Sequence, residues 1–188
     1  MLTIIPAGRE GTIHGFPRPR TTVTALAAPL PASLSRLYAR PGFLLRRAHQ
    51  ISAAVFEDEC RELGLTPAQF GVLTILRSHP GMGQSSLARA LGFDKVTVLR
   101  VLRGLETRGL VSRAPAPDNK RNVSVALTAE GAAVLTRAQK PAERAYKRLL
   151  APLDKEQQAQ LVALLQLLTG ELEDDARAAF VPPGRKNG

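Results

Sequence analysis

The stretch QSSLARALGFDKVTVLRVLRGLETRGLVSRAPAPDNKR occupies residues 84–121 and predicts two short helices, a strand and a basic loop. Gly92 ends the first helix, because a residue without a Cβ can take the left-handed conformation that a helix C-terminus often needs. Asp94 begins the second helix, where its side chain can accept from a free backbone N–H. Two short helices joined by so tight a turn predict a helix-turn-helix, whose second helix fits a DNA major groove.

The second helix separates apolar from polar side chains. Its apolar residues recur at helical spacing and should face the core: Val98, Val101, Leu102 and Leu105. Its polar residues fall on the other faces: Lys95, Thr97, Arg100 and Arg103. Lys95, Thr97 and Arg100 are best placed to reach base edges, and arginine to guanine is the commonest base-specific contact.

Residues 110–127 predict a two-stranded wing with a basic tip. Val123, Val125 and Leu127 alternate with smaller residues, which is the period of a half-buried strand. The loop before them is basic, and its cations should contact phosphates or the flanking minor groove. These cations are Arg113, Lys120 and Arg121.

The charge of this region favours DNA as the partner. Residues 84–121 hold eight Lys or Arg against three Asp or Glu, an excess of five positive charges. A charge run alone is usually a solvated face, but a basic second helix and a basic wing together indicate DNA binding. The candidate DNA-binding residues are Lys95, Thr97, Val98, Arg100, Arg103, Arg113, Lys120 and Arg121.

Three segments of the chain resemble the MarR-type winged helix-turn-helix regulators. They are LTPAQFGVLTIL at residues 65–76, LARALGFDKVTVLRVLRGLETRGLV at 87–111 and VALTAEG at 125–131. The resemblance extends from about Pro41 to Leu168. It implies a mainly α fold with a small two-stranded β-wing, a winged helix-turn-helix flanked by N- and C-terminal dimerisation helices.

The wing tip departs from the family pattern at one position. Relatives often carry an acid at the position of Asn119, paired with the arginine that matches Arg121. Here the acid lies one place earlier, at Asp118. The wing-tip salt bridge of the family then depends on Asp118 substituting for that acid.

The segment PGFLLRRAHQISAAVF at residues 41–56 further resembles a branch of the family that responds to aromatic acids or their breakdown intermediates. Arg46 and His49 lie on neighbouring positions of one side of this helix. In one interpretation they are solvated or pair with acids across a dimer. In the other they line a ligand cleft, where the guanidinium would hold a carboxylate and the imidazole would orient a ring substituent.

The resemblance implies a dimeric transcriptional regulator, a repressor that a small aromatic effector releases from a palindromic operator. The terminal helices carry more leucine than a small winged domain can cover, which also favours a homodimer. A dimer would place two recognition helices one turn of DNA apart, roughly 34 Å. A ligand-independent architectural DNA-binding protein is an alternative.

Cys60 raises a further alternative, a redox-sensing regulator of the same family. Arg61 beside it could lower the pKa of the thiol and make it reactive. Peroxide-sensing relatives place their cysteine near the start of the early helix, with tyrosines around it. Cys60 lies at the far end of the helix, so an inert thiol is the simpler interpretation.

The composition argues against other classes of protein. The net charge of +10 favours a polyanionic partner. No apolar run approaches the roughly 20 residues of a membrane-spanning helix and no signal-peptide pattern is found, so we expect a cytoplasmic protein. One cysteine and three scattered histidines make no recognisable metal site. Without a nucleophile elbow, a phosphate-binding glycine loop or paired carboxylates, we expect neither an enzyme nor a cofactor.

The 188 residues suit one domain with extensions. Residues 1–32 hold five prolines and no sustained period, so we expect a disordered or extended arm. The winged domain should cover residues 33–180, with dimerisation helices at about 33–63 and 141–178 and a DNA-binding part at about 66–128. The basic Pro/Gly-rich residues 181–188 should form a disordered tail.

Overall fold

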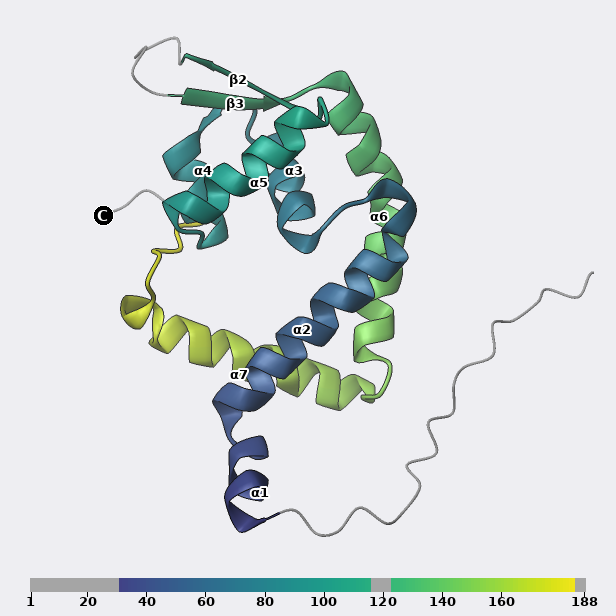
Figure 1. Ribbon diagram of the computed structural model, residues 1–188, viewed down its shortest axis with the longest axis vertical. Coiled ribbons are helices and arrows are strands. Elements are labelled where there is room, and N and C mark those ends of the chain that lie inside the picture. The colour runs from purple at the N-terminus through teal and green to yellow at the C-terminus, as the bar shows by residue number, and fades with distance from the viewer. Residues whose placement is uncertain (1–30, 116–122, 185–188) are drawn as a thin grey trace, which may run out of the picture. The chain divides into compact units, whose positions relative to one another are not determined.

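The computed structural model describes residues 31–115 and 123–184. The chain divides into two compact units, residues 1–40 and residues 41–188. The described part of the first unit forms one helix, α1 (Ala32–Tyr38). The predicted N-terminal arm lies outside the described residues apart from its last two positions. The second unit carries the remaining elements and is treated by itself from here on (Figure 1).

The second unit begins and ends with long helices. α2 (Pro41–Glu59) leads into the short 3-10 helix η1 (Arg61–Leu63). At the other end, α6 (Ala129–Leu150) is followed by α7 (Lys155–Glu171) and the short η2 (Glu173–Asp175). α2 packs along α6, so two segments far apart in the sequence lie side by side (Figure 1). We call α2, α6 and α7 the outer helices.

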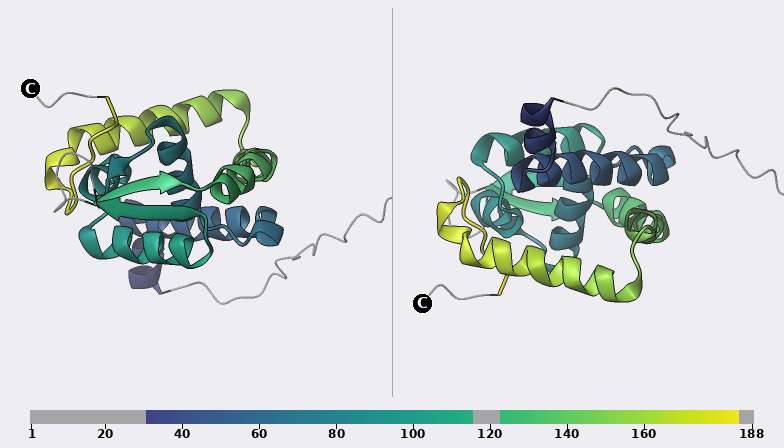
Figure 2. Two further views of the ribbon diagram at one scale, coloured as in Figure 1. Left: turned by 90° about the horizontal axis from the view of Figure 1, so that it is seen from above. Right: turned by 90° about the horizontal axis from the view of Figure 1, so that it is seen from below.

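The winged domain is formed by the elements that come between η1 and α6 in the chain. Its elements in chain order are α3 (Pro67–Ser78), β1 (Met82–Gly83), α4 (Gln84–Leu91), α5 (Lys95–Thr107), β2 (Val111–Pro115) and β3 (Val123–Leu127). Gly92 joins α4 to α5 with a φ of 62°, the left-handed conformation predicted for it. The strands lie beside α5 in both orientations of the molecule (Figure 2). The predicted winged helix-turn-helix is therefore confirmed.

Side-chain caps explain where several helices begin. At α3, the Thr66 hydroxyl accepts the Gln69 N–H at 3.3 Å, and the Gln69 side chain accepts the Thr66 N–H at 3.2 Å. Pro67 follows at the first helical position, where its missing N–H costs nothing. Asp154 and Gln157 form the same reciprocal box at the start of α7.

The wing contains one strand more than the sequence predicted. β3 pairs antiparallel with β2, with Val111 opposite Leu127, and also with β1, with Met82 opposite Val125. The sheet order is β1-β3-β2. β1 has two residues, and a segment that short gives no alternation from which a strand could be predicted.

The core of the winged domain collects apolar side chains from all its layers. Those almost completely buried include Leu65, Leu73, Leu76, Leu87, Leu102, Leu105, Leu110, Val125 and Leu135. They come from α3, α4, α5, β3, the first half of α6 and the connections that precede α3 and β2. Because α5 contributes to this core, its orientation is fixed by packing on one side and its other side is left for a partner.

The junction between wing and α6 requires a glycine. A Cβ added at Gly131 would lie 1.9 Å from the carbonyl oxygen of Leu110, far inside any van der Waals contact. Thr128 holds the same junction, because its hydroxyl donates to the Gly109 carbonyl at 2.7 Å and accepts the Gly131 N–H at 3.0 Å. The glycine of the LTAEG segment thus allows α6 to start directly against the beginning of β2.

α7 contrasts with this core, because no residue of the helix is buried. Its leucines, among them Leu164 at 64% and Leu167 at 60% exposure, face solvent. Among the described residues, no helix is long and apolar enough to cross a membrane.

After α7 and η2 the chain returns to α4. Val181 donates its N–H to the carbonyl of Arg89 at 2.9 Å, so residues 181–184 lie against the winged domain. The sequence predicted a disordered tail here because Pro and Gly dominate it, and a single backbone hydrogen bond leaves no sequence signal. Residues 185–188 lie outside the described part of the chain.

Candidate nucleic-acid interface

α5, the second helix of the helix-turn-helix, has a buried and an exposed stripe on opposite sides. The buried stripe consists of Val98, Leu102 and Leu105. The exposed stripe has the same spacing of four and three residues and consists of Val96, Arg100 and Arg103. Lys95, the first residue of the helix, is exposed as well. The guanidinium groups of Arg100 and Arg103 and the ammonium group of Lys95 are therefore exposed on the face of α5 that points away from the core.

Two valines of α5 differ from the predicted set of DNA-binding residues. Val98 was included among the candidate DNA-binding residues, but it is only 1% exposed and packs in the core. It supports α5 from inside and does not reach a partner. Val96 was not predicted to contact DNA, yet it is 76% exposed at the first turn. Its position four residues before Arg100 was the available signal, and an apolar residue type masked that signal.

Asp94 caps the start of α5. Its carboxylate accepts the Thr97 N–H at 2.7 Å and the Thr97 hydroxyl at 3.1 Å. The bond from the Thr97 N–H is the main reason that the pKa of Asp94 lies below its usual range. Thr97, a candidate for base contact, therefore already donates its hydroxyl proton to the Asp94 carboxylate. A hydroxyl that donates to Asp94 still offers lone pairs, so it can only accept from a base.

Arg113 lies on β2 and is ion-paired with Glu106 of α5. The hydrogen bond from Arg113 is the main cause that lowers the pKa of Glu106. The pair joins the wing to α5. Arg113 is thus half-buried between wing and helix, where the sequence analysis expected a cation in the wing loop. The other two predicted wing cations, Lys120 and Arg121, lie outside the described residues, together with Asp118 and Asn119.

Arg108, one of the eight cations of residues 84–121, is hydrogen-bonded to the protein's own backbone. Its guanidinium donates to the carbonyl of Gly64 at 2.7 Å and to the carbonyl of Leu63 at 2.6 Å. Those carbonyls end η1, which follows α2. Arg108 follows α5 directly, so it ties the end of the recognition helix to the connection between α2 and α3.

The predicted ligand residues lie elsewhere, on α2. Arg46 and His49 are both exposed. The Arg46 guanidinium lies over the ring of Phe43, 5.0 Å from its centroid, and donates to Gln50 at 3.3 Å. Arg47 donates to the same Gln50 oxygen at 3.4 Å. The basic side chains at the centre of α2 are therefore arranged on one exposed face, with an aromatic ring beside one guanidinium.

Cys60 has the environment of an inert thiol. It is 1% exposed and belongs to the core cluster. Burial raises the pKa of the thiol, and the charge of Arg144 only partly opposes that shift. Arg61, the neighbour that could have activated it, is ion-paired with Asp58. A reactive cysteine needs solvent access and a lowered pKa, so the geometry disfavours a redox sensor based on Cys60.

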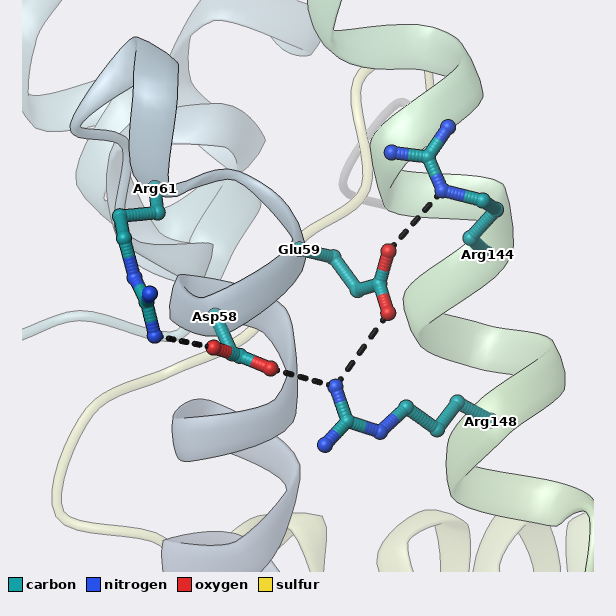
Figure 3. A network of polar contacts seen from close by, with 5 residues as sticks. All are labelled: Asp58, Glu59, Arg61, Arg144 and Arg148. Carbon is teal, nitrogen blue, oxygen red and sulfur yellow. Dashed lines mark hydrogen bonds and ion pairs between the residues drawn. The ribbon is translucent and has the colours of Figure 1, made fainter. Parts of the chain in front are cut away.

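A network of charged side chains joins the end of α2 to the second half of α6 (Figure 3). Arg148 contacts Asp58 at 2.6 Å and Glu59 at 3.3 Å, while Arg144 contacts Glu59 at 2.9 Å. The hydrogen bond from Arg148, followed by the charge of Arg61, lowers the pKa of Asp58. The network is largely exposed, so it fixes how the two helices lie more than it adds to stability.

The chain is similar in sequence and structure to known proteins. The sequence profile of the MarR family matches residues 65–123. The HTH-type transcriptional repressor NicR of Pseudomonas putida is 33% identical over 155 residues, which cover 82% of this chain and 96% of that protein.

Two solved structures are similar over most of the chain. The transcriptional repressor CouR, bound to a 23-mer DNA duplex, has a TM-score of 0.68 at 32% identity. The match covers 76% of this chain and 99% of the CouR chain. Bordetella bronchiseptica BpsR, whose DNA binding is regulated by 6-hydroxynicotinic acid, has a TM-score of 0.66 at 30% identity and covers 70% of this chain and 94% of its own.

Proposed function

The chain belongs to the MarR family of transcriptional regulators, and we propose that it is a homodimeric, sequence-specific repressor that a small aromatic acid releases from its operator. The observation that carries the DNA-binding part is the exposed stripe of α5, opposite a fully buried stripe. A helix that the core holds in this way can enter a major groove without moving. The structural neighbour CouR is itself bound to DNA.

Each exposed residue of α5 has a role in this proposal. Arg100 reads a base edge, since arginine pairs with guanine through two hydrogen bonds, and Lys95 assists at the helix start. Val96 contacts the methyl group of a thymine. Arg103 contacts phosphate, as do Lys120 and Arg121. Arg113 also contacts phosphate while it remains ion-paired with Glu106. Thr97 accepts from a base while it donates to Asp94.

The dimer follows from the surface of the outer helices. α7 leaves Leu161, Leu164, Leu165, Leu167 and Leu168 more than a third exposed, and α2 does the same with Leu44, Leu45 and Ile51. Water contact costs about 25 cal/mol per Å² of apolar surface, so a second copy that covers these helices gains stability. Two copies also provide the two recognition helices that a palindromic operator requires.

The effector proposal rests on α2 and on the relatives. Arg46 can hold a carboxylate and the neighbouring His49 can orient a ring substituent. The regulation of BpsR by 6-hydroxynicotinic acid, an aromatic carboxylate, supports an effector of this chemistry. Such a ligand can lower DNA affinity only if it binds one spacing of the recognition helices better than another.

The DNA-binding proposal is tested by fluorescence anisotropy on the DNA upstream of the protein's own gene, beside a scrambled duplex, at two salt concentrations. We expect tight binding to the first duplex only. Arg100→Ala should reduce the preference by roughly a hundredfold or more, because the proposed dimer loses one bidentate base contact in each half-site. Arg137→Ala, an exposed arginine on α6, is the matched control and should bind like the wild type. Equal affinity for both duplexes would instead identify an architectural DNA-binding protein.

The effector proposal is tested on the same complex with benzoates, hydroxycinnamates, their CoA thioesters and 6-hydroxynicotinic acid. We expect one compound to release the operator. Arg46→Ala and His49→Ala should each raise the concentration needed for release, while Arg47→Ala, on the neighbouring position, should not. If no compound acts on the wild type, or if the three variants respond alike, the roles of Arg46 and His49 are wrong.

A further inference from the structure

The last described residues connect η2, which directly follows the outer helix α7, to the helix-turn-helix through two consecutive N–H groups. Phe180 donates to a carboxylate oxygen of Glu173 at 2.7 Å, and Val181 donates to the carbonyl of Arg89 at 2.9 Å. Glu173 belongs to η2, two residues after α7, whereas Arg89 belongs to the last turn of α4. One dipeptide is therefore hydrogen-bonded to both elements, and the ribbon follows it from the end of α7 to α4 (Figure 1).

The contact on α4 lies directly at the turn of the helix-turn-helix. The Arg89 carbonyl is one of the last carbonyls of α4, and it also accepts the Gly92 N–H at 3.2 Å. A Cβ on Gly92 would lie 3.8 Å from the Cβ of Phe180, so the segment passes over the turn in ordinary van der Waals contact. The turn that sets the angle between α4 and α5 is thus covered by the C-terminal segment.

The segment is stiff but not tightly packed. Pro182 and Pro183 fix φ near −65° and remove two backbone donors, so few conformations are open to it. Val181, Pro182 and Pro183 are half-buried. A cavity of about 270 Å³ remains between them and a surface that includes His79 and Ser86. Because Phe180 and Val181 are adjacent, no flexible residue lies between the two hydrogen bonds, and a shift of η2 can reach α4 through them.

We propose that residues 180–184 form a strap that couples α7 to the first helix of the helix-turn-helix. The Phe180 N–H ties the start of the strap to Glu173 of η2, directly after the outer helix, and the N–H of the next residue, Val181, ties it to Arg89 of α4. A displacement of α7 then pulls on the turn at Gly92 and changes the orientation of α5. The effect on DNA affinity rests on the proposed function, whereas the mechanical coupling between α7 and α4 does not.

Hydrogen exchange of the α4 amides tests the coupling without DNA or effector. Val181→Pro removes the donor to Arg89, and Glu173→Ala removes the acceptor at the α7 end. Each should speed exchange in α4 and the Gly92 turn by a few-fold, up to about tenfold, as expected for the loss of one hydrogen bond. Val181→Ala keeps the N–H and Glu173→Gln keeps an acceptor oxygen, so both controls should exchange like the wild type.

The double variant Glu173→Ala/Val181→Pro separates coupling from two local effects. If the strap transmits the change, exchange in α4 is no faster in the double variant than in Val181→Pro alone. Additive effects, an effect of Val181→Pro without one of Glu173→Ala, or unchanged exchange in all variants would each overturn the proposal. If the wild-type protein shows no preference for the operator but the variants show the expected exchange pattern, the proposed function is refuted and the strap proposal stands.

Discussion

The winged domain and α7 use apolar residues in opposite ways. The winged domain closes its own core, with leucines from helices and wing almost completely removed from water. α7 is richer in leucine than any strand of the wing, yet none of its residues is buried within the chain. The first region therefore closes its core within a single chain, whereas the second leaves an apolar face open, which the proposed dimer would cover. The proposed DNA contacts and the proposed dimer contacts therefore depend on different sets of side chains, so substitutions can disturb them separately.

The largest effect is expected where the winged domain is closest to a steric limit. Gly131→Ala places a methyl group on the Leu110 carbonyl, so α6 must move away from the wing. We expect a loss of about 3 kcal/mol or more in the free energy of unfolding, measured by urea denaturation. Gly170→Ala, at a glycine of α7 with no atom near the added Cβ, should leave stability unchanged or raise it slightly. Equal stability of both variants would mean that α6 is not seated against Leu110.

The next effect tests the other side of the comparison. Leu164→Glu with Leu167→Glu puts charges on the exposed face of α7, and we expect sedimentation to show monomers whose helix content is unchanged. Operator affinity should fall at least about a hundredfold, because one recognition helix then binds alone. Gln166→Glu adds a charge at a position that is already polar and should leave the dimer intact. A dimer that survives the double substitution would exclude α7 from the interface.

A smaller effect is expected at the winged domain, where the end of α5 is tied to the end of η1. Arg108→Met removes the donor to the Leu63 and Gly64 carbonyls, which should cost about 1 kcal/mol of stability because the site is exposed. Arg103→Met, on the outer stripe of α5, should weaken DNA binding and reduce its salt dependence with no loss of stability. If the melting temperatures of the two variants coincide, Arg108 does not hold the recognition helix to the end of η1.

The smallest expected effect is the loss of stability at low pH when the Asp58 carboxylate is protonated. The pKa of Asp58 is lowered by Arg148 and Arg61, so the carboxylate stabilises the fold above its usual pKa of 3.8, and that stabilisation is lost as the pH falls through the depressed value. Arg148→Met removes the main cause of the shift. The difference in thermal stability between wild type and variant should therefore be constant near neutral pH and shrink below about pH 4. A difference that does not depend on pH would show that the ion pair is not formed in solution.

Local sequence rules predicted much of the recognition half. The Asp94 cap, the left-handed Gly92 and the inward spacing of Val98, Leu102 and Leu105 depend on residues a few positions apart, and the structure confirms each of them. The DNA-contacting residues are still a prediction. Val98 is corrected, because a spacing that places a residue in the core also removes it from the surface.

Tertiary structure decided what depends on residues distant in the sequence. Pairing of β1 with β3, the return of Val181 to Arg89 and the hold of Arg108 on the Leu63 and Gly64 carbonyls leave no periodic trace. The sequence by itself determined the helix-turn-helix and its basic outer face, since spacing, caps and charge are local properties. Only the folded chain decided which cations stay free, because an arginine becomes a DNA contact or a structural tie according to the carboxylates and carbonyls that the fold brings within its reach.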